Sequence, residues 1–220
     1  MSPLLNRLRT KIFADGADTS QMLTLSKNPL IRGFTTNPTL MKKAGVRDYE
    51  AFAREILAEI PDKPISFEVF SDDFDGMEQQ ARKIASWGDN VYVKIPITNT
   101  RGETSYGLAE KLSKDGVKIN VTAIMLLQQV RGVGHAVTGG APCCVSVFAG
   151  RIADTGRDPV PIMREAVQVL ATKKNAELIW ASPRELLNLF QAEEVGCHII
   201  TATEDVLKKL EIVDRDLADY

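Results

Sequence analysis

Residues 65–97 read ISFEVFSDDFDGMEQQARKIASWGDNVYVKIPI, and this stretch decides the fold. It begins and ends with short apolar runs, 65–70 and 91–97, that are rich in β-branched and aromatic residues and typical of buried strands. Between them Met77, Ala81 and Ile84 recur at three- to four-residue spacing, which predicts an amphipathic helix. A strand, a helix and a strand in this order predict two parallel strands joined by a crossover helix.

The same alternation continues along the whole chain. Further strands are expected at residues 12–17, 33–37, 118–124, 143–150, 178–182 and 198–201, with amphipathic stretches between them. An open doubly wound sheet would satisfy this order. Eight such repeats in 220 residues, without an obvious glycine-rich nucleotide loop, favour a closed barrel. We therefore expect an α/β fold, a single (β/α)8 TIM barrel over residues 1–220, with its chemistry at the carboxyl ends of the strands.

Composition excludes several classes of function. The net charge of −2 offers no strong field for nucleic acid or an anionic membrane, and no 18-residue apolar run is present. The polar N-terminal segment does not resemble a secretory signal, so we expect a soluble, untargeted protein. An odd set of cysteines, Cys143, Cys144 and Cys197, predicts reduced thiols and a cytoplasmic location. With only His135 and His198, a three-histidine metal site is not expected.

Lys94 interrupts the apolar run 91–97, and Pro96 indicates that the strand ends just beyond it. Both faces of a strand in a parallel barrel are covered, so the amine would be poorly hydrated. Desolvation favours the neutral form, and a neutral lysine can attack a carbonyl to form an imine. A lysine that reaches the barrel rim, or one that protects an edge strand, fits the segment equally well.

Two carboxylates accompany this lysine at strand ends. Asp15 closes the first strand, where it could move protons; a turn or helix-capping role is the alternative, although Asp18 is the better cap. Glu68 lies between two phenylalanines in the third strand, where a carboxylate needs a partner. Pairing with Lys94 on the next strand would supply one, either for proton transfer or as a purely structural ion pair.

Polar side chains also follow the second and fifth strands. Thr36 and Asn37 precede Pro38, and the Asn37 amide could hold a substrate oxygen, although Asn-Pro also marks turns. Asn120 and Thr122 are two residues apart, so both should face the barrel interior, where they need partners such as water or substrate.

Two basic segments are candidate phosphate sites. Residues 146–151 contain Ser146, Phe148 and Arg151, and residues 182–184 contain Ser182 and Arg184. A proline after Ser182 suits the first turn of a helix, so Ser182 is expected to cap one, and a helix N-terminus beside an arginine binds anions. The alternative is that both arginines are surface residues paired with neighbouring acids.

Taken together, these segments resemble the transaldolase family, including its short branch of fructose-6-phosphate aldolases. The resemblance covers residues 13–210. The most specific motifs are Thr35-Thr36-Asn37-Pro38 and Val93-Lys94-Ile95-Pro96, in this order and at this spacing. Weaker matches are Ala14-Asp15, Asn120-Val121-Thr122, Phe148-Ala149-Gly150-Arg151-Ile152 and Ala181-Ser182-Pro183-Arg184.

The resemblance implies a role for each residue. Lys94 would form a Schiff base without metal or organic cofactor, and Asp15 would be the acid/base that cleaves the carbon–carbon bond. Glu68 and Thr122 would hold the catalytic water. The implied donor-sugar contacts are Thr36, Asn37, Asn120, Ser146 and Phe148, and the implied phosphate site is Arg151, Ser182 and Arg184.

Within this family the aldolase branch typically carries Gln in place of Glu68 and Tyr in place of Phe148, so this chain resembles true transaldolases at both positions. Pro183 replaces an aromatic residue that is common there. We expect transfer of a dihydroxyacetone unit from a ketose phosphate to an aldose acceptor. The alternatives are a fructose-6-phosphate aldolase, a non-catalytic phosphosugar-binding barrel, and a lyase or isomerase without an imine. Short barrels of this branch often form rings, and the tail after Leu210 could reach a neighbouring subunit, so a homo-oligomer is expected.

Overall fold

The computed structural model describes residues 2–219 and confirms the (β/α)8 barrel. Parallel strands pair in sequence order from β1 to β8, and β8 closes the ring by pairing with β1. The strands are β1 Lys11–Asp15, β2 Ile31–Thr35, β3 Ile65–Glu68, β4 Val91–Pro96, β5 Ile119–Ile124, β6 Cys143–Val147, β7 Ala176–Trp180 and β8 Ile199–Thr203.

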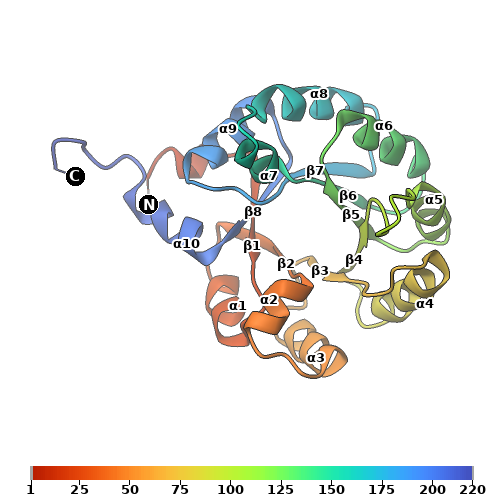
Figure 1. Ribbon diagram of the computed structural model, residues 1–220. Coiled ribbons are helices and arrows are strands. Elements are labelled where there is room, and N and C mark those ends of the chain that lie inside the picture. Colours follow the sequence, from red (N-terminus) through yellow and green to blue (C-terminus); the bar gives the residue numbers. More distant parts are fainter. Residues whose placement is uncertain (1, 220) are drawn as a thin grey trace.

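Helices surround this ring of strands (Figure 1). The α-helices are α1 Thr19–Ser26, α2 Pro38–Lys43, α3 Tyr49–Glu59, α4 Phe74–Ala85, α5 Tyr106–Lys114, α6 Leu127–Ala136, α7 Ala149–Asp154, α8 Val160–Leu170, α9 Leu187–Val195 and α10 Glu204–Leu207. Short 3-10 helices span Leu5–Arg7 and Lys208–Ile212. Asp18 caps α1 as expected, because its side chain accepts a hydrogen bond from the Gln21 amide.

The strand register brings the polar residues of the central strands to one level. Lys94 on β4 is paired with Glu68 on β3 and with Asn120 on β5. Paired residues on adjacent parallel strands point to the same side of a sheet, so these three side chains all face the barrel interior. The register therefore places the lysine between a carboxylate and an amide.

Apolar residues pack inside the barrel around these polar side chains. Phe13, Cys144, Ile179, Ala181 and Ile199 form a cluster inside the ring, separate from the larger core between strands and helices. Cys144 is paired with Asn120, and Ala181 lines the cavity at the carboxyl end, so this cluster reaches the level of the polar residues.

Strand ends differ most from the sequence expectation at β6. The expected strand 143–150 stops at Val147, because Phe148 has left extended geometry and α7 begins at Ala149. The other strands shift by one or two residues at one or both ends. Cys143, Cys144 and Cys197 are buried free thiols, and a cytoplasmic location stays a prediction.

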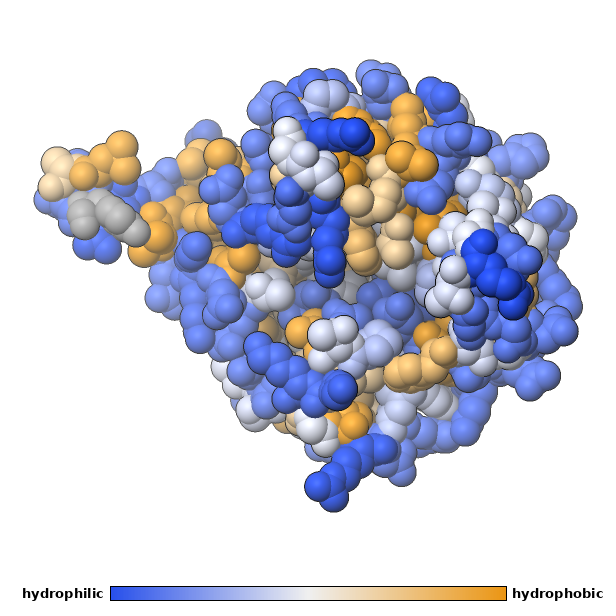
Figure 2. Space-filling model, in the orientation of Figure 1, coloured by the Kyte–Doolittle hydropathy of each residue, from blue (hydrophilic) through white to orange (hydrophobic). Residues whose placement is uncertain are grey.

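The chain beyond Ile212 extends away from the barrel (Figure 1). Figure 2 shows apolar side chains on this projecting segment, where Leu217 is 89% exposed. Contact of this tail with another subunit stays a prediction. Of the helices in residues 2–219, none combines the length and the apolar character needed to cross a bilayer.

Candidate active site

Lys94 lies at the wall of a cavity of about 510 Å³ at the carboxyl end of the strands. Its side chain is nearly buried, with 7% of the residue exposed. The amine donates a hydrogen bond to the Thr36 carbonyl at 2.9 Å and lies 3.2 Å from a carboxylate oxygen of Glu68. The amine is therefore held in place by polar partners, and its surroundings are more polar than the apolar run 91–97 alone indicates.

Asp15 faces the same cavity from β1. The Thr35 hydroxyl donates to its carboxylate at 2.7 Å, and the Thr201 hydroxyl lies 2.6 Å from that of Thr35. Burial raises the pKa of Asp15, and this exceeds the opposing effects of the nearby Lys94 charge and of the Thr35 hydrogen bond. A carboxylate with a raised pKa is a better proton acceptor, which suits a general base.

Thr122 presents a buried hydroxyl for which the described residues 2–219 provide no hydrogen-bond partner. The residue lines the cavity two residues beyond the Lys94 level, toward the carboxyl end, since Thr122 is paired with Pro96. A buried polar atom without a partner is rare, and this hydroxyl retains the capacity for a hydrogen bond at the cavity.

A β-bulge follows Thr122. The register between β5 and β6 shifts after Val121, and Ala123 adopts a left-handed conformation with φ of 60°. Such a bulge redirects side chains at the end of a strand, and Ala123 lines the cavity beside Thr122. Strain in a non-glycine residue at this position is typical of functional sites.

Asn120 and Thr36 act beneath the cavity, although both were expected to contact substrate. Asn120 is fully buried; its amide donates to the Ser66 hydroxyl at 3.0 Å and its carbonyl oxygen accepts from Ser146 at 2.7 Å. The Thr36 hydroxyl donates to the Ser66 carbonyl at 2.8 Å. Neither residue lines the cavity, so in this structure they orient Ser146 and Lys94, which do.

Asn37 lines the cavity and also caps a helix. Its side-chain oxygen accepts from the Leu40 amide at 2.9 Å, with Pro38 in the first turn of α2. The cap uses the side-chain oxygen, which leaves the amide nitrogen as the group for a substrate.

The two expected phosphate segments lie against each other. The Gly150 amide donates to the Ala181 carbonyl at 3.3 Å, and a β-carbon on Gly150 would lie only 1.5 Å from the Ser182 carbonyl oxygen. The expectation that Ser182 caps a helix is wrong: Ser182 has a left-handed φ of 57°, and α9 begins only at Leu187. Proline at residue 183 instead continues an irregular segment along the cavity.

The two arginines of this region differ in their partners. Arg184 forms a two-pronged ion pair with Asp154, the alternative considered from the sequence, and this hydrogen bonding lowers the pKa of Asp154. Arg151 has no acceptor or ion-pair partner among residues 2–219. Both line the cavity, together with Ser146, Phe148 and Ser182, so one rim carries positive charge that an anion can meet.

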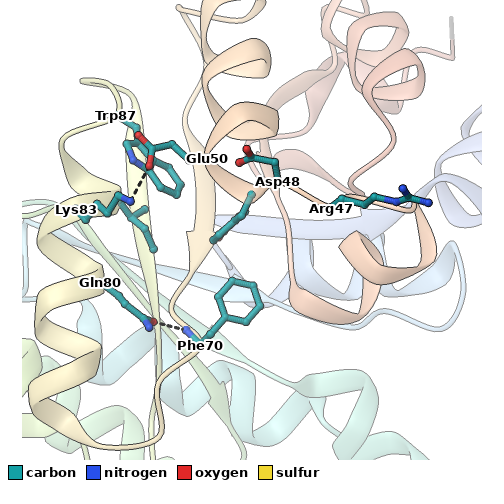
Figure 3. Close-up of a pocket in the computed structure, with 9 residues that line it drawn as sticks. Arg47, Asp48, Glu50, Phe70, Gln80, Lys83 and Trp87 are labelled. Atoms are coloured by element: carbon teal, nitrogen blue, oxygen red, sulfur yellow. Dashed lines mark hydrogen bonds and ion pairs between the residues drawn. The ribbon is translucent and has the colours of Figure 1, made fainter.

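Some cavity residues were missed from the sequence. Thr35, Thr201 and Thr203 line it with Asp15, because they come from the paired ends of β2 and β8. Thr201 ended the expected strand 198–201, so its place at a carboxyl end was a usable signal. Another hollow, of about 450 Å³, lies outside the barrel between α3 and α4, and Figure 3 shows Phe70 and Trp87 at its sides.

Fold and site together define a (β/α)8 barrel with a buried lysine and two carboxylates at the carboxyl end of its strands. A family model described as transaldolase/fructose-6-phosphate aldolase matches residues 12–217. The chain belongs to this family.

Relatives support the assignment over most of their length. The "Probable transaldolase" of Dehalococcoides mccartyi is 35% identical over 201 residues, which cover 91% of this chain and 89% of that protein. The "Probable transaldolase 2" of Listeria monocytogenes is 37% identical over 201 residues, which cover 91% and 88%. A HpcH/Hpal aldolase/citrate lyase family protein from Burkholderia cenocepacia has a TM-score of 0.63 at 12% identity, over 100% of this chain and 99% of that one. This last likeness concerns the fold alone.

Proposed function

We propose that this protein is a transaldolase that transfers a dihydroxyacetone unit from a ketose phosphate to an aldose acceptor through a Schiff base on Lys94. The observation that carries the proposal is the position of the Lys94 amine, nearly buried at the cavity wall and 3.2 Å from the Glu68 carboxylate. The names of the relatives, probable transaldolases, support the same activity.

In the first step the Lys94 amine attacks the C2 ketone of the donor. The amine needs to lose a proton before it attacks, and the adjacent Glu68 carboxylate, 3.2 Å away, is a base that can accept it. Loss of the C2 oxygen as water then gives a protonated imine, which serves as the electron sink, so no cofactor is required. Thr122, with its unpartnered hydroxyl, and Glu68 would hold this water.

In the second step Asp15 takes the proton of the C4 hydroxyl, and the C3–C4 bond breaks to release an aldehyde. The electrons of that bond remain on Lys94 as an enamine. Burial raises the pKa of Asp15, so its carboxylate is suited to accept this proton. After the enamine attacks the acceptor aldehyde, Asp15 returns a proton to the new hydroxyl. Transfer requires that the enamine is not protonated before the acceptor arrives.

Substrate contacts follow from the cavity lining. The Asn37 amide, the Ser146 hydroxyl and the Phe148 ring would contact the dihydroxyacetone unit, and the donor phosphate would meet Arg151, Ser182 and Arg184. Thr36 and Asn120 would act indirectly, through Lys94 and Ser146.

Incubation with fructose 6-phosphate, with and without an aldose or aldose-phosphate acceptor, tests this function. We expect a new ketose phosphate only when acceptor is present. Release of free dihydroxyacetone without acceptor would instead establish the fructose-6-phosphate aldolase alternative. Binding of fructose 6-phosphate with neither product would indicate the non-catalytic phosphosugar-binding barrel.

A further inference from the structure

The hydroxyl of Tyr49, the first residue of α3, donates a hydrogen bond to the main-chain carbonyl of Glu68 at 2.9 Å. Glu68 is the last residue of β3, and its carboxylate is the partner of Lys94. A side chain from a surrounding helix therefore reaches the main chain of a cavity residue without lining the cavity itself.

This contact replaces a hydrogen bond that the sheet cannot supply. Along the β2–β3 ladder the Phe34 amide donates to the Pro64 carbonyl at 2.9 Å, and the Thr36 amide donates to the Ser66 carbonyl at 3.1 Å. Two residues further on the ladder has ended, because residue 38 is a proline without an N–H group and begins α2. The Tyr49 hydroxyl supplies the missing donor, because a partly buried carbonyl left without a partner is costly.

The surroundings fix Tyr49 in this position. Its ring makes edge contacts with Phe67, Phe70 and Trp87 at centroid distances of 6.1, 5.0 and 5.3 Å. Burial raises the pKa of Tyr49 far above any working pH, so the hydroxyl remains a hydrogen-bond donor.

The chain beyond Glu68 is held from the opposite side. The Gln80 side chain on α4 accepts a hydrogen bond from the Phe70 amide at 2.7 Å (Figure 3). It also accepts one from the Ser71 amide at 3.0 Å. The Val69 amide donates to the Lys94 carbonyl at 3.2 Å, which ties the same segment to β4. The end of β3 is thus held between α3 and α4.

We infer that Tyr49 is a positioning residue for the reaction: by binding the Glu68 carbonyl, its hydroxyl holds the Glu68 carboxylate beside the Lys94 amine. This inference rests on the function proposed above, in which Glu68 serves proton and water transfer at Lys94. Tyr49 contacts no reacting atom, so its effect is on the geometry of Glu68.

The Tyr49→Phe variant tests this role, because it keeps the ring and removes the donor. A displacement of about 1 Å at a catalytic group can cost up to about 10²-fold in rate, so we expect kcat to fall roughly tenfold, with KM changed by less than about twofold. Tyr106→Phe is the matched control: it removes a tyrosine hydroxyl from the first residue of α5 and leaves Tyr49 and its aromatic neighbours unchanged. We expect its kcat to stay within about twofold of the wild-type value.

Equal losses of kcat in the two variants, or an unchanged kcat in Tyr49→Phe, would overturn the inference. A crystal structure of Tyr49→Phe gives a readout that does not depend on activity. We expect the Glu68 carboxylate to move away from the Lys94 amine, and an unchanged contact would contradict the positioning role. If the wild-type protein has no transaldolase or aldolase activity, the proposed function fails, and the crystal structure still decides whether Tyr49 positions Glu68.

Discussion

Gly150 lies so close to Ser182 that a β-carbon at residue 150 would be 1.5 Å from the Ser182 carbonyl oxygen. This contact holds α7, which carries Arg151, against the segment before α9, which carries Arg184. Both arginines lie at the cavity rim. Because the nearest atom belongs to the main chain of Ser182, a methyl group at residue 150 would force one of the two segments to move.

We therefore predict that Gly150→Ala lowers the free energy of unfolding by about 1–3 kcal/mol and raises KM for fructose 6-phosphate. Chemical denaturation and steady-state kinetics would measure both effects. Gly107→Ala is the control, since nothing lies within 4 Å of its new methyl group on α5. A gain of up to about 1 kcal/mol is expected there. If the Gly150→Ala variant has the same stability and KM as the wild type, the two segments can separate without cost and the prediction is wrong.

Asp15→Asn should stabilise the protein while it removes activity. Because the folded-state pKa of Asp15 is raised above its ordinary value of 3.8, the folded protein favours the neutral acid. Below pH 3.8 Asp15 is neutral in both the folded and the unfolded protein, so wild type and variant should have nearly equal free energies of unfolding. As the pH rises from there through the folded pKa of Asp15, the wild type should become less stable than the variant.

Urea denaturation of both proteins across the acid to neutral range would measure this difference. The difference in unfolding free energy between the Asp15→Asn variant and the wild type should grow with pH, with a slope of at most about 1.4 kcal/mol per pH unit for one proton. Activity should fall at least about 10²-fold if Asp15 is the acid/base. A variant less stable than wild type at neutral pH would mean that the Lys94 and Thr35 contacts outweigh the burial of Asp15.

Arg151→Gln should weaken binding of phosphorylated donors selectively. A charge-assisted hydrogen bond contributes about 1.5–3 kcal/mol, so kcat/KM for fructose 6-phosphate should fall roughly 10- to 100-fold. Turnover of unphosphorylated fructose as donor, with the same acceptor, is the control and should change little. A parallel loss with both donors would place the phosphate elsewhere. Since Arg184 is already paired with Asp154, the same change at Arg184 should have the smaller effect.

Glu68→Gln should destabilise the protein, because it leaves the nearly buried Lys94 amine without its carboxylate partner. The expected loss is about 1–3 kcal/mol, reduced by the open cavity beside the pair. Adding Lys94→Met should recover part of that loss, since no charge then needs a partner. Thermal unfolding of the two single variants and the double variant would measure the coupling. Strictly additive losses would mean that the two side chains do not stabilise each other.

Much of the fold was predictable because buried parallel strands leave a local pattern. The runs 65–70 and 91–97 are mostly apolar, and the stretch between them has helical periodicity. Strand ends were less predictable, because they depend on neighbouring chain segments. Residues 143–150 look like one strand in sequence, yet α7 begins at Ala149.

The site was predictable where a residue breaks a local rule, as Lys94 does in its apolar run. It was not predictable where a role depends on the register of distant segments. The capping role expected of Ser182 was wrong because Ser182 has a left-handed conformation, packs against Gly150 and lies well before α9 begins at Leu187. Tyr49 gave no signal of its own, since its contact with Glu68 depends on how α3 packs against the end of β3, beyond the last bonds of the β2–β3 ladder.

Covalent trapping on Lys94 tests the central claim most directly. The protein would be treated with sodium borohydride in the presence of fructose 6-phosphate, and its peptides analysed by mass spectrometry. We predict a reduced three-carbon or hexose-phosphate adduct on Lys94, and no adduct when Lys94→Arg protein is treated in the same way. An unmodified Lys94 in active protein, or an adduct on a different lysine, would contradict the account.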